Sequence, residues 1–239
     1  MNKEMTTTAG ELDGCDGGDA GSPEAPSIWL FGIEHGIYRS IHDPDFSAQP
    51  DDQNYSVDTQ LQWPYNQKAF KLLAAIAGEE VDDYVDFARA RQPFVKNAKG
   101  YFKGNLYPYS CRSTSDWPAQ AQQETGMSKV QYRDWCQEHH FPLIRGLIDR
   151  HQPKIFIGVG ITCRAEFSRA MFGDVVPLDL HRFQVNGHWK KIFHAQASGR
   201  RLVVVPHLSG GRYGLNSNES LRIAGKFIAD FIEARQSGL

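Results

Sequence analysis

Three uninterrupted runs of large apolar residues stand out along the chain, and each predicts a β-strand. They occupy residues 28–31, 155–159 and 202–205. Continuous rather than alternating hydrophobicity is typical of strands that are covered on both faces, as in the interior of a parallel sheet. Residues 182–193 carry a different signal, because Asn186 and Gly187 separate two strand-like segments. That dipeptide predicts a β-hairpin with a type I′ turn.

Helical periodicity fills the segments between these strands. Apolar residues recur at spacings of three and four over residues 69–76, 144–148, 163–171 and 224–231. We expect Thr162 to cap the third of these helices, and Asn216 with Glu219 has the spacing of a capping box before the fourth. Buried strands that alternate with amphipathic helices predict an α/β fold, a three-layer sandwich whose central, mostly parallel sheet is flanked by helices.

The first 26 residues differ in composition from the rest of the chain. Residues 1–26 hold six acidic side chains against one lysine, and almost no large apolar side chain. Such a segment buries too little surface to offset its ordering entropy. We therefore expect a disordered acidic tail over residues 1–26 and a single α/β domain over residues 27–239, which agrees with the length of 239 residues.

The net charge of the whole chain hides an uneven distribution. The 26 Lys and Arg residues oppose 28 Asp and Glu residues, which gives a formal net charge of −2. Residues 182–239 alone hold nine basic side chains against three acidic ones, a net charge of +6. The average argues against a strongly basic nucleic-acid-binding protein, whereas the basic C-terminal quarter permits a face that binds phosphates.

Several other classes of protein are disfavoured by the sequence. No apolar run approaches the roughly 20 residues of a membrane span and no signal-peptide core is visible, so we expect a cytoplasmic protein without a membrane partner. The four cysteines form no Cys-x-x-Cys pair, which predicts free thiols. Neither a His-Glu-x-x-His motif nor a Gly-x-Ser-x-Gly motif is present, so no metal site and no serine hydrolase of the usual α/β type is predicted.

Chemically active side chains are expected where the strands end, because ligands of open α/β sheets bind beyond the carboxyl ends of the strands. Gly32-Ile33-Glu34-His35-Gly36 follows the first strand and places a carboxylate between two glycines that allow close approach of a ligand. A second glycine-rich segment, from Pro206 to Gly214, follows the last strand and has His207 near its start. A third candidate is Asn105, which lies in an aromatic stretch.

These three segments, in this order, resemble the motifs of the uracil-DNA glycosylase superfamily. That family has a G-x-[D/E/N]-x-G turn, an internal strand with an asparagine, and a His-x-Ser loop after a valine-rich strand. Trp63-Pro64-Tyr65-Asn66 ahead of a helix and Ile157-Gly158-Val159-Gly160 ahead of another are also similar to family features. The resemblance extends over most of residues 28–235, and each motif alone is short.

The resemblance implies a role for each matching residue. Glu34 matches the carboxylate that positions water, and His207 matches the imidazole that stabilises the departing base. Base binding is implied for Gly32, Phe46 and Asn105. Contact with DNA is implied for the loop residues Ser209, Gly210, Gly211, Arg212 and Tyr213. The resemblance further implies hydrolysis of an N-glycosidic bond to an altered base, DNA as the partner, no cofactor and no obligatory protein partner.

Two departures from the family pattern leave an alternative open. His35 and Leu208 stand where the family usually has proline, which loosens the expected preorganisation of both loops. The alternative is a non-catalytic module with a glycosylase-like fold that binds a nucleobase or nucleic acid for regulation. A different small-molecule hydrolase on the same fold is a third option.

Overall fold

The computed structural model describes residues 12, 14, 15, 17–36, 56–111 and 113–234. Its centre is a sheet in which seven described strands have the order β1-β5-β4-β6-β9-β8-β7. These strands are β1 (Gly17–Gly18), β4 (Ile28–Gly36), β5 (Tyr101–Cys111), β6 (Ile155–Val159), β7 (Asp179–Val185), β8 (His188–Ala197) and β9 (Arg200–Val205). The four inner strands β5, β4, β6 and β9 are parallel, and β1, β8 and β7 are antiparallel to their neighbours.

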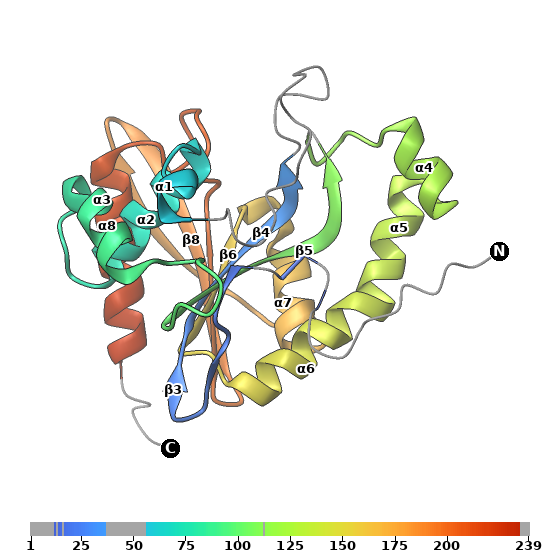
Figure 1. The fold of residues 1–239 in the computed structure, drawn as a ribbon, viewed down its shortest axis with the longest axis horizontal. Helices are drawn as coiled ribbons and strands as arrows, with labels where there is room; N and C mark the ends of the chain where they lie inside the picture. Colours follow the sequence, from blue (N-terminus) through green and yellow to red (C-terminus); the bar gives the residue numbers. More distant parts are fainter. Residues whose placement is uncertain (1–11, 13, 16, 37–55, 112, 235–239) are drawn as a thin grey trace.

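Helices cover both faces of this sheet, so the three-layer α/β architecture expected from the sequence is confirmed (Figure 1). One face is covered by α2 (Pro64–Ile76), α3 (Tyr84–Arg91) and α8 (Asn218–Glu233). The other is covered by α5 (Lys129–Trp135), a π-helical segment (Cys136–His140), α6 (Phe141–His151) and α7 (Arg164–Phe172). Shorter helices are α1 (Val57–Gln60), α4 (Ala119–Thr125) and the 3₁₀ turns Val81–Asp83 and Ile161–Cys163.

The continuous apolar runs are explained by burial on both sides of the sheet. In β6, Ile157 packs with α2 and α8, whereas the neighbouring Phe156 packs with α6 and α7. Val203 and Val204 of β9 divide between the two cores in the same way. Both positions of each strand must therefore be apolar, as in parallel sheets generally.

The expected β-hairpin is also present, and its turn has the predicted chemistry. Strands β7 and β8 pair from Val185–His188 at the turn to Asp179–His194 at the other end. Asn186 and Gly187 between them have φ of 50° and 76°. Positive φ at both central residues is the requirement of a type I′ turn.

The prediction of a disordered tail over residues 1–26 is wrong for its second half. Gly17–Gly18 pairs with Phe102 and Lys103 of β5, and the short hairpin β2 (Gly21–Ser22) and β3 (Ala25–Pro26) follows directly. Leu12 and Cys15 are buried in the core. Glycine-rich composition suggested disorder, but this segment is held by backbone hydrogen bonds, which composition does not report.

Three local boundaries differ from those expected. Strand β4 does not end at Gly32 but continues to Gly36, so Glu34 lies within the strand. Thr162 lies inside a 3₁₀ turn and does not cap α7, whose N-cap is Cys163 without a side-chain bond. Helix α8 is capped by Ser217 together with Ser220, one residue later than the predicted Asn216 and Glu219.

No helix among the described residues is long and apolar enough to cross a membrane. The four cysteines form no disulfide, as their spacing predicted, and all four are buried.

Candidate functional site

The carboxyl edge of the sheet, where the parallel strands β4, β5, β6 and β9 end, brings two predicted site residues directly together. Gly32 of β4 and Asn105 of β5 are register partners. A Cβ atom at Gly32 would lie 2.4 Å from Oδ1 of Asn105 and 3.7 Å from the hydroxyl of Tyr65 on α2. The absence of a side chain at Gly32 therefore leaves the space in which the buried Asn105 amide lies.

His207 also lies beside Tyr65. It follows β9 and Pro206, and its ring centroid lies 6.3 Å from that of Tyr65 in an edge-on arrangement. Tyr65 thus lies near both His207 and Gly32. We call Gly32, Tyr65, Asn105 and His207 the Asn105–His207 cluster. Its residues come from β4, from α2, from β5 and from the loop after β9.

The protonation state of His207 follows from its surroundings. Its Nδ1 accepts a hydrogen bond of 3.1 Å from the backbone N–H of Ser209, so the neutral ring carries its proton on Nε2. Burial of the ring, with the positive charge of Lys68 second, holds the pKa of His207 below its usual range, although much of the residue's surface is exposed. At neutral pH His207 is therefore a neutral donor through Nε2.

Glu34 is directed toward α5 rather than toward the Asn105–His207 cluster. Its carboxylate forms ion pairs of 3.1 Å with Lys129 and 3.0 Å with Arg133, and its side chain is only 6% exposed. Lys129 also donates to the carbonyl oxygens of Ser113 and Asp116, at 3.3 and 2.7 Å. Arg133 donates to the carbonyl oxygen of Thr114 at 2.9 Å. Glu34 with these two cations carries a net charge of +1.

The predicted DNA-binding loop is exposed at the same edge of the sheet. Ser209, Gly210, Gly211, Arg212 and Tyr213 are all solvent-exposed. The guanidinium of Arg212 lies 4.9 Å from the centroid of the Tyr213 ring. Asn216 donates to the carbonyl oxygen of Gly211 at 2.7 Å, which closes the loop. The loop therefore presents a cation and an aromatic ring to solvent.

The buried ammonium of Lys190, on β8, ties this loop to the β7–β8 hairpin. It donates to the carbonyl oxygens of Arg212 and Gly214 at 2.5 and 2.8 Å. A cavity of about 280 Å³ lies beside this contact and is lined by residues of the hairpin and of the loop, including Gly211 and Arg212.

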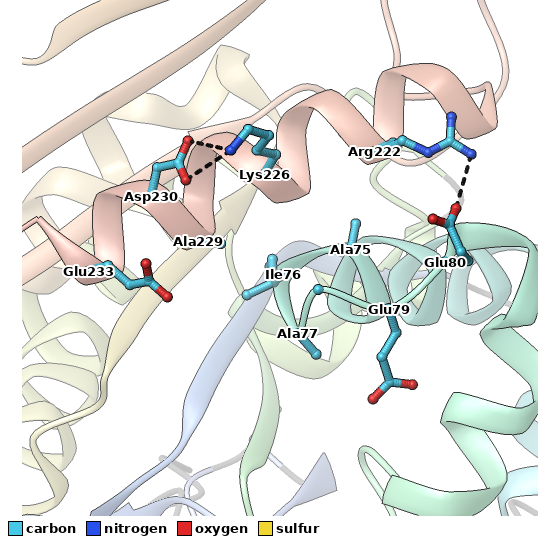
Figure 2. A pocket seen from close by; sticks show the side chains of 11 residues that line it. Ala75, Ile76, Ala77, Glu79, Glu80, Arg222, Lys226, Ala229, Asp230 and Glu233 are labelled. Carbon is cyan, nitrogen blue, oxygen red and sulfur yellow. Dashed lines mark hydrogen bonds and ion pairs between the residues drawn. The ribbon is translucent and has the colours of Figure 1, made fainter.

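A second cavity, of about 340 Å³, lies away from these residues. Figure 2 shows it between the end of α2 and the outer side of α8, where Arg222 pairs with Glu80 at 3.6 Å and Lys226 pairs with Asp230 at 3.2 Å. None of the predicted site residues lines it. Four of its six charged side chains form these two ion pairs, so we place the candidate site at the carboxyl edge instead.

Three side chains of this edge were not predicted from the sequence, and one predicted residue lies outside the described residues. The sequence places Tyr65 only in a family-like segment and gives no prediction for Lys129 or Arg133. Their signal was present, since Lys129 and Arg133 are four residues apart at the start of a helix capped by Ser128. The prediction for Phe46 lies outside the described residues.

The chain matches no protein-family model and no curated protein.

Proposed function

We propose that this protein is a base-excising hydrolase of the uracil-DNA glycosylase type, which cleaves the N-glycosidic bond of an altered base in DNA. The observation that carries the proposal is the Asn105–His207 cluster at the carboxyl edge of the parallel strands. Ligands of open α/β sheets bind at this edge. The exposed Arg212 and Tyr213 beside the cluster supply groups that suit a nucleic acid.

The cluster has the donors and acceptors that base excision requires. Departure of the base places negative charge on its ring, and the Nε2–H of His207 is a neutral donor for that charge. The Asn105 amide donates and accepts at once, so it distinguishes a carbonyl edge of a base from an amino edge. Water adds to the sugar carbon as the bond to the base breaks, and the base leaves with a proton.

The role of Glu34 distinguishes a catalytic function from a function of binding alone. Its two ion pairs hold the carboxylate in a fixed orientation, which suits a group that positions the attacking water. The same ion pairs give the Glu34 group a net charge of +1, which would not stabilise a cationic sugar. This second effect favours the alternative function, a non-catalytic module that binds a base or nucleic acid through Asn105 and His207.

An excision assay distinguishes the two functions. The protein is incubated with oligonucleotides that carry uracil, hypoxanthine or a G·T mismatch, and alkali-labile sites are measured. We expect cleavage that is lost in Asn105→Ala and reduced by a factor of about 10²–10³ in His207→Ala, the usual cost of one such donor. His139→Ala, an exposed histidine on the π-helical segment, is the matched control and should cleave normally.

The Glu34→Gln variant then tests the acid. Loss of cleavage with retained binding supports Glu34 as the residue that positions water. Binding of these oligonucleotides by the wild-type protein without any alkali-labile product would refute the hydrolase and favour the binding module.

A further inference from the structure

The outer face of the β7–β8 hairpin combines positive charge with exposed aromatic surface. Phe183, Val185 and Ile192 point into the core with α2 and α8. Because side chains alternate along a strand, the intervening residues lie on the opposite face. From the turn as far as Leu180 and Phe193, these outward positions are Leu180, Arg182, Gln184, Trp189, Lys191 and Phe193. None of the six is acidic.

Two features of this face are unfavourable for the isolated protein. Trp189 is 58% exposed, the greatest exposure of any described tryptophan side chain. Arg182 and Lys191 lie directly opposite each other in the register of the hairpin, where like charges are destabilising. Both features become favourable if a ligand supplies negative charge and a flat surface for stacking.

A third cation extends the same face. The guanidinium of Arg164, at the start of α7, lies 5.0 Å from the centroid of the Phe193 ring. Trp189, Lys191 and Phe193 are two residues apart along β8, where Trp189 is exposed and Phe193 is half-buried against the core that contains α6 and α7. Adjacent groups of this row are about 7 Å apart, given the rise of an extended strand.

This face adjoins the candidate site. Strand β8 runs antiparallel to β9, so its first residues, His188 and Trp189, lie at the carboxyl edge beyond Val205. Figure 1 shows the orange hairpin and the orange-red loop after β9 at the same end of the sheet. The hydrogen bonds from Lys190 to the carbonyl oxygens of Arg212 and Gly214 join the two segments directly.

We propose that the outer face of the β7–β8 hairpin binds single-stranded nucleic acid, with Trp189 stacked on an unpaired base and Arg182 and Lys191 on its phosphates. A duplex offers only base edges and phosphates, whereas an exposed tryptophan ring needs the face of a base. The inference rests on the proposed function and deepens it, because it names an unpaired strand as the form in which the substrate is held.

Binding of undamaged oligonucleotides tests this inference apart from excision. The probe is a labelled oligothymidylate of about 16 nucleotides, a length that covers site sizes of this kind. Its affinity is measured by fluorescence anisotropy over a range of salt concentrations and compared with that of a duplex of the same length. We expect the single strand to bind more tightly than the duplex.

The two kinds of contact are separated by their dependence on salt. Trp189→Ala should weaken binding about 5- to 150-fold, the cost of one lost stacking contact, with an unchanged salt slope. Arg182→Ala and Lys191→Ala should each lower the slope of log affinity against log salt by about 0.7. The controls are Leu143→Ala, an exposed apolar residue on α6, and Lys154→Ala, a cation before β6 at the opposite edge.

The outcomes distinguish this inference from the proposed function. Binding that depends on Trp189 without any base excision supports the inference and removes the hydrolase. Excision by a Trp189→Ala variant that still binds the single strand within twofold of wild type overturns the inference alone. Tighter binding of the duplex, or no binding of the single strand, also overturns it. Thermal melting of each variant confirms that it is folded.

Discussion

The buried ion pairs of Glu34 are expected to contribute strongly to stability, and Glu34→Gln tests this. The substitution keeps the shape of the side chain but removes its charge, which leaves Lys129 and Arg133 without their carboxylate. The side chains of Glu34, Lys129 and Arg133 are 6%, 12% and 27% exposed, so solvent replaces little of the lost interaction. Breaking a buried ion pair by removing one partner costs about 3–5 kcal/mol.

We expect the lower end of that range, about 3 kcal/mol, because both cations keep bonds to backbone carbonyl oxygens. In a domain of this size such a loss lowers Tm by about 6–12 °C. The free energy of unfolding is measured by urea denaturation at neutral pH. The matched control is Glu79→Gln, since Glu79 pairs with Arg91 at 3.4 Å on an exposed surface and should cost less than about 1 kcal/mol.

A second substitution shows whether the cost comes from uncompensated charge. Lys129→Met in the Glu34→Gln background removes one of the two stranded cations, so the double variant should lose less stability than the sum of the two single variants. A Glu34→Gln variant within about 1 kcal/mol of wild type would refute the reasoning, because the ion pairs would then contribute no more than surface pairs.

Three further predictions follow from single positions. Gly32→Ala places a Cβ atom 2.4 Å from Oδ1 of Asn105, so it should destabilise the protein by about 1–3 kcal/mol and abolish binding of a base. The control is Gly146→Ala in α6, whose Cβ meets no atom within 4 Å and which should stabilise the protein by up to about 1 kcal/mol in urea denaturation. Because the pKa of His207 is lowered in the folded protein, the unfolded chain takes up a proton first as pH falls below about 6.5. The wild-type protein should therefore lose more stability between pH 7.5 and 5.5 than His207→Gln does, and equal losses would contradict this. Burial raises the pKa of Cys136 to about 12 and of Cys163 to about 11. A thiol reagent should therefore label the native protein slowly and should label all four cysteines only after unfolding, and rapid labelling of the native protein would contradict the burial.

The central strands and the hairpin were predictable because their sequence signals are local. Apolar runs at 28–31, 155–159 and 202–205 report burial on both faces, and Asn186-Gly187 reports a turn that requires positive φ. The N-terminal strands were not predictable in the same way. Gly17–Gly18 is ordered by hydrogen bonds to β5, more than 80 residues away in the chain, and its own side chains carry no signal.

The candidate site shows the same division between local and distant information. The position of His207 after the end of β9 follows from the crevice rule for α/β sheets, whereas Gly32 and Asn105 lie inside β4 and β5 as register partners. The direction of the Glu34 side chain does not follow from that rule, because it is set by Lys129 and Arg133, which are 95 and 99 residues further along the chain. Sequence alone therefore located the carboxylate but not its partners.

The central claim is tested most directly by release of a free base under single-turnover conditions, with protein in excess over a uracil-containing oligonucleotide. The released base is measured by chromatography for wild type and for Asn105→Ala. The proposed function predicts stoichiometric release by wild type and none by Asn105→Ala. Binding of the oligonucleotide with no release of uracil, hypoxanthine or the mismatched thymine from the corresponding substrates would contradict it.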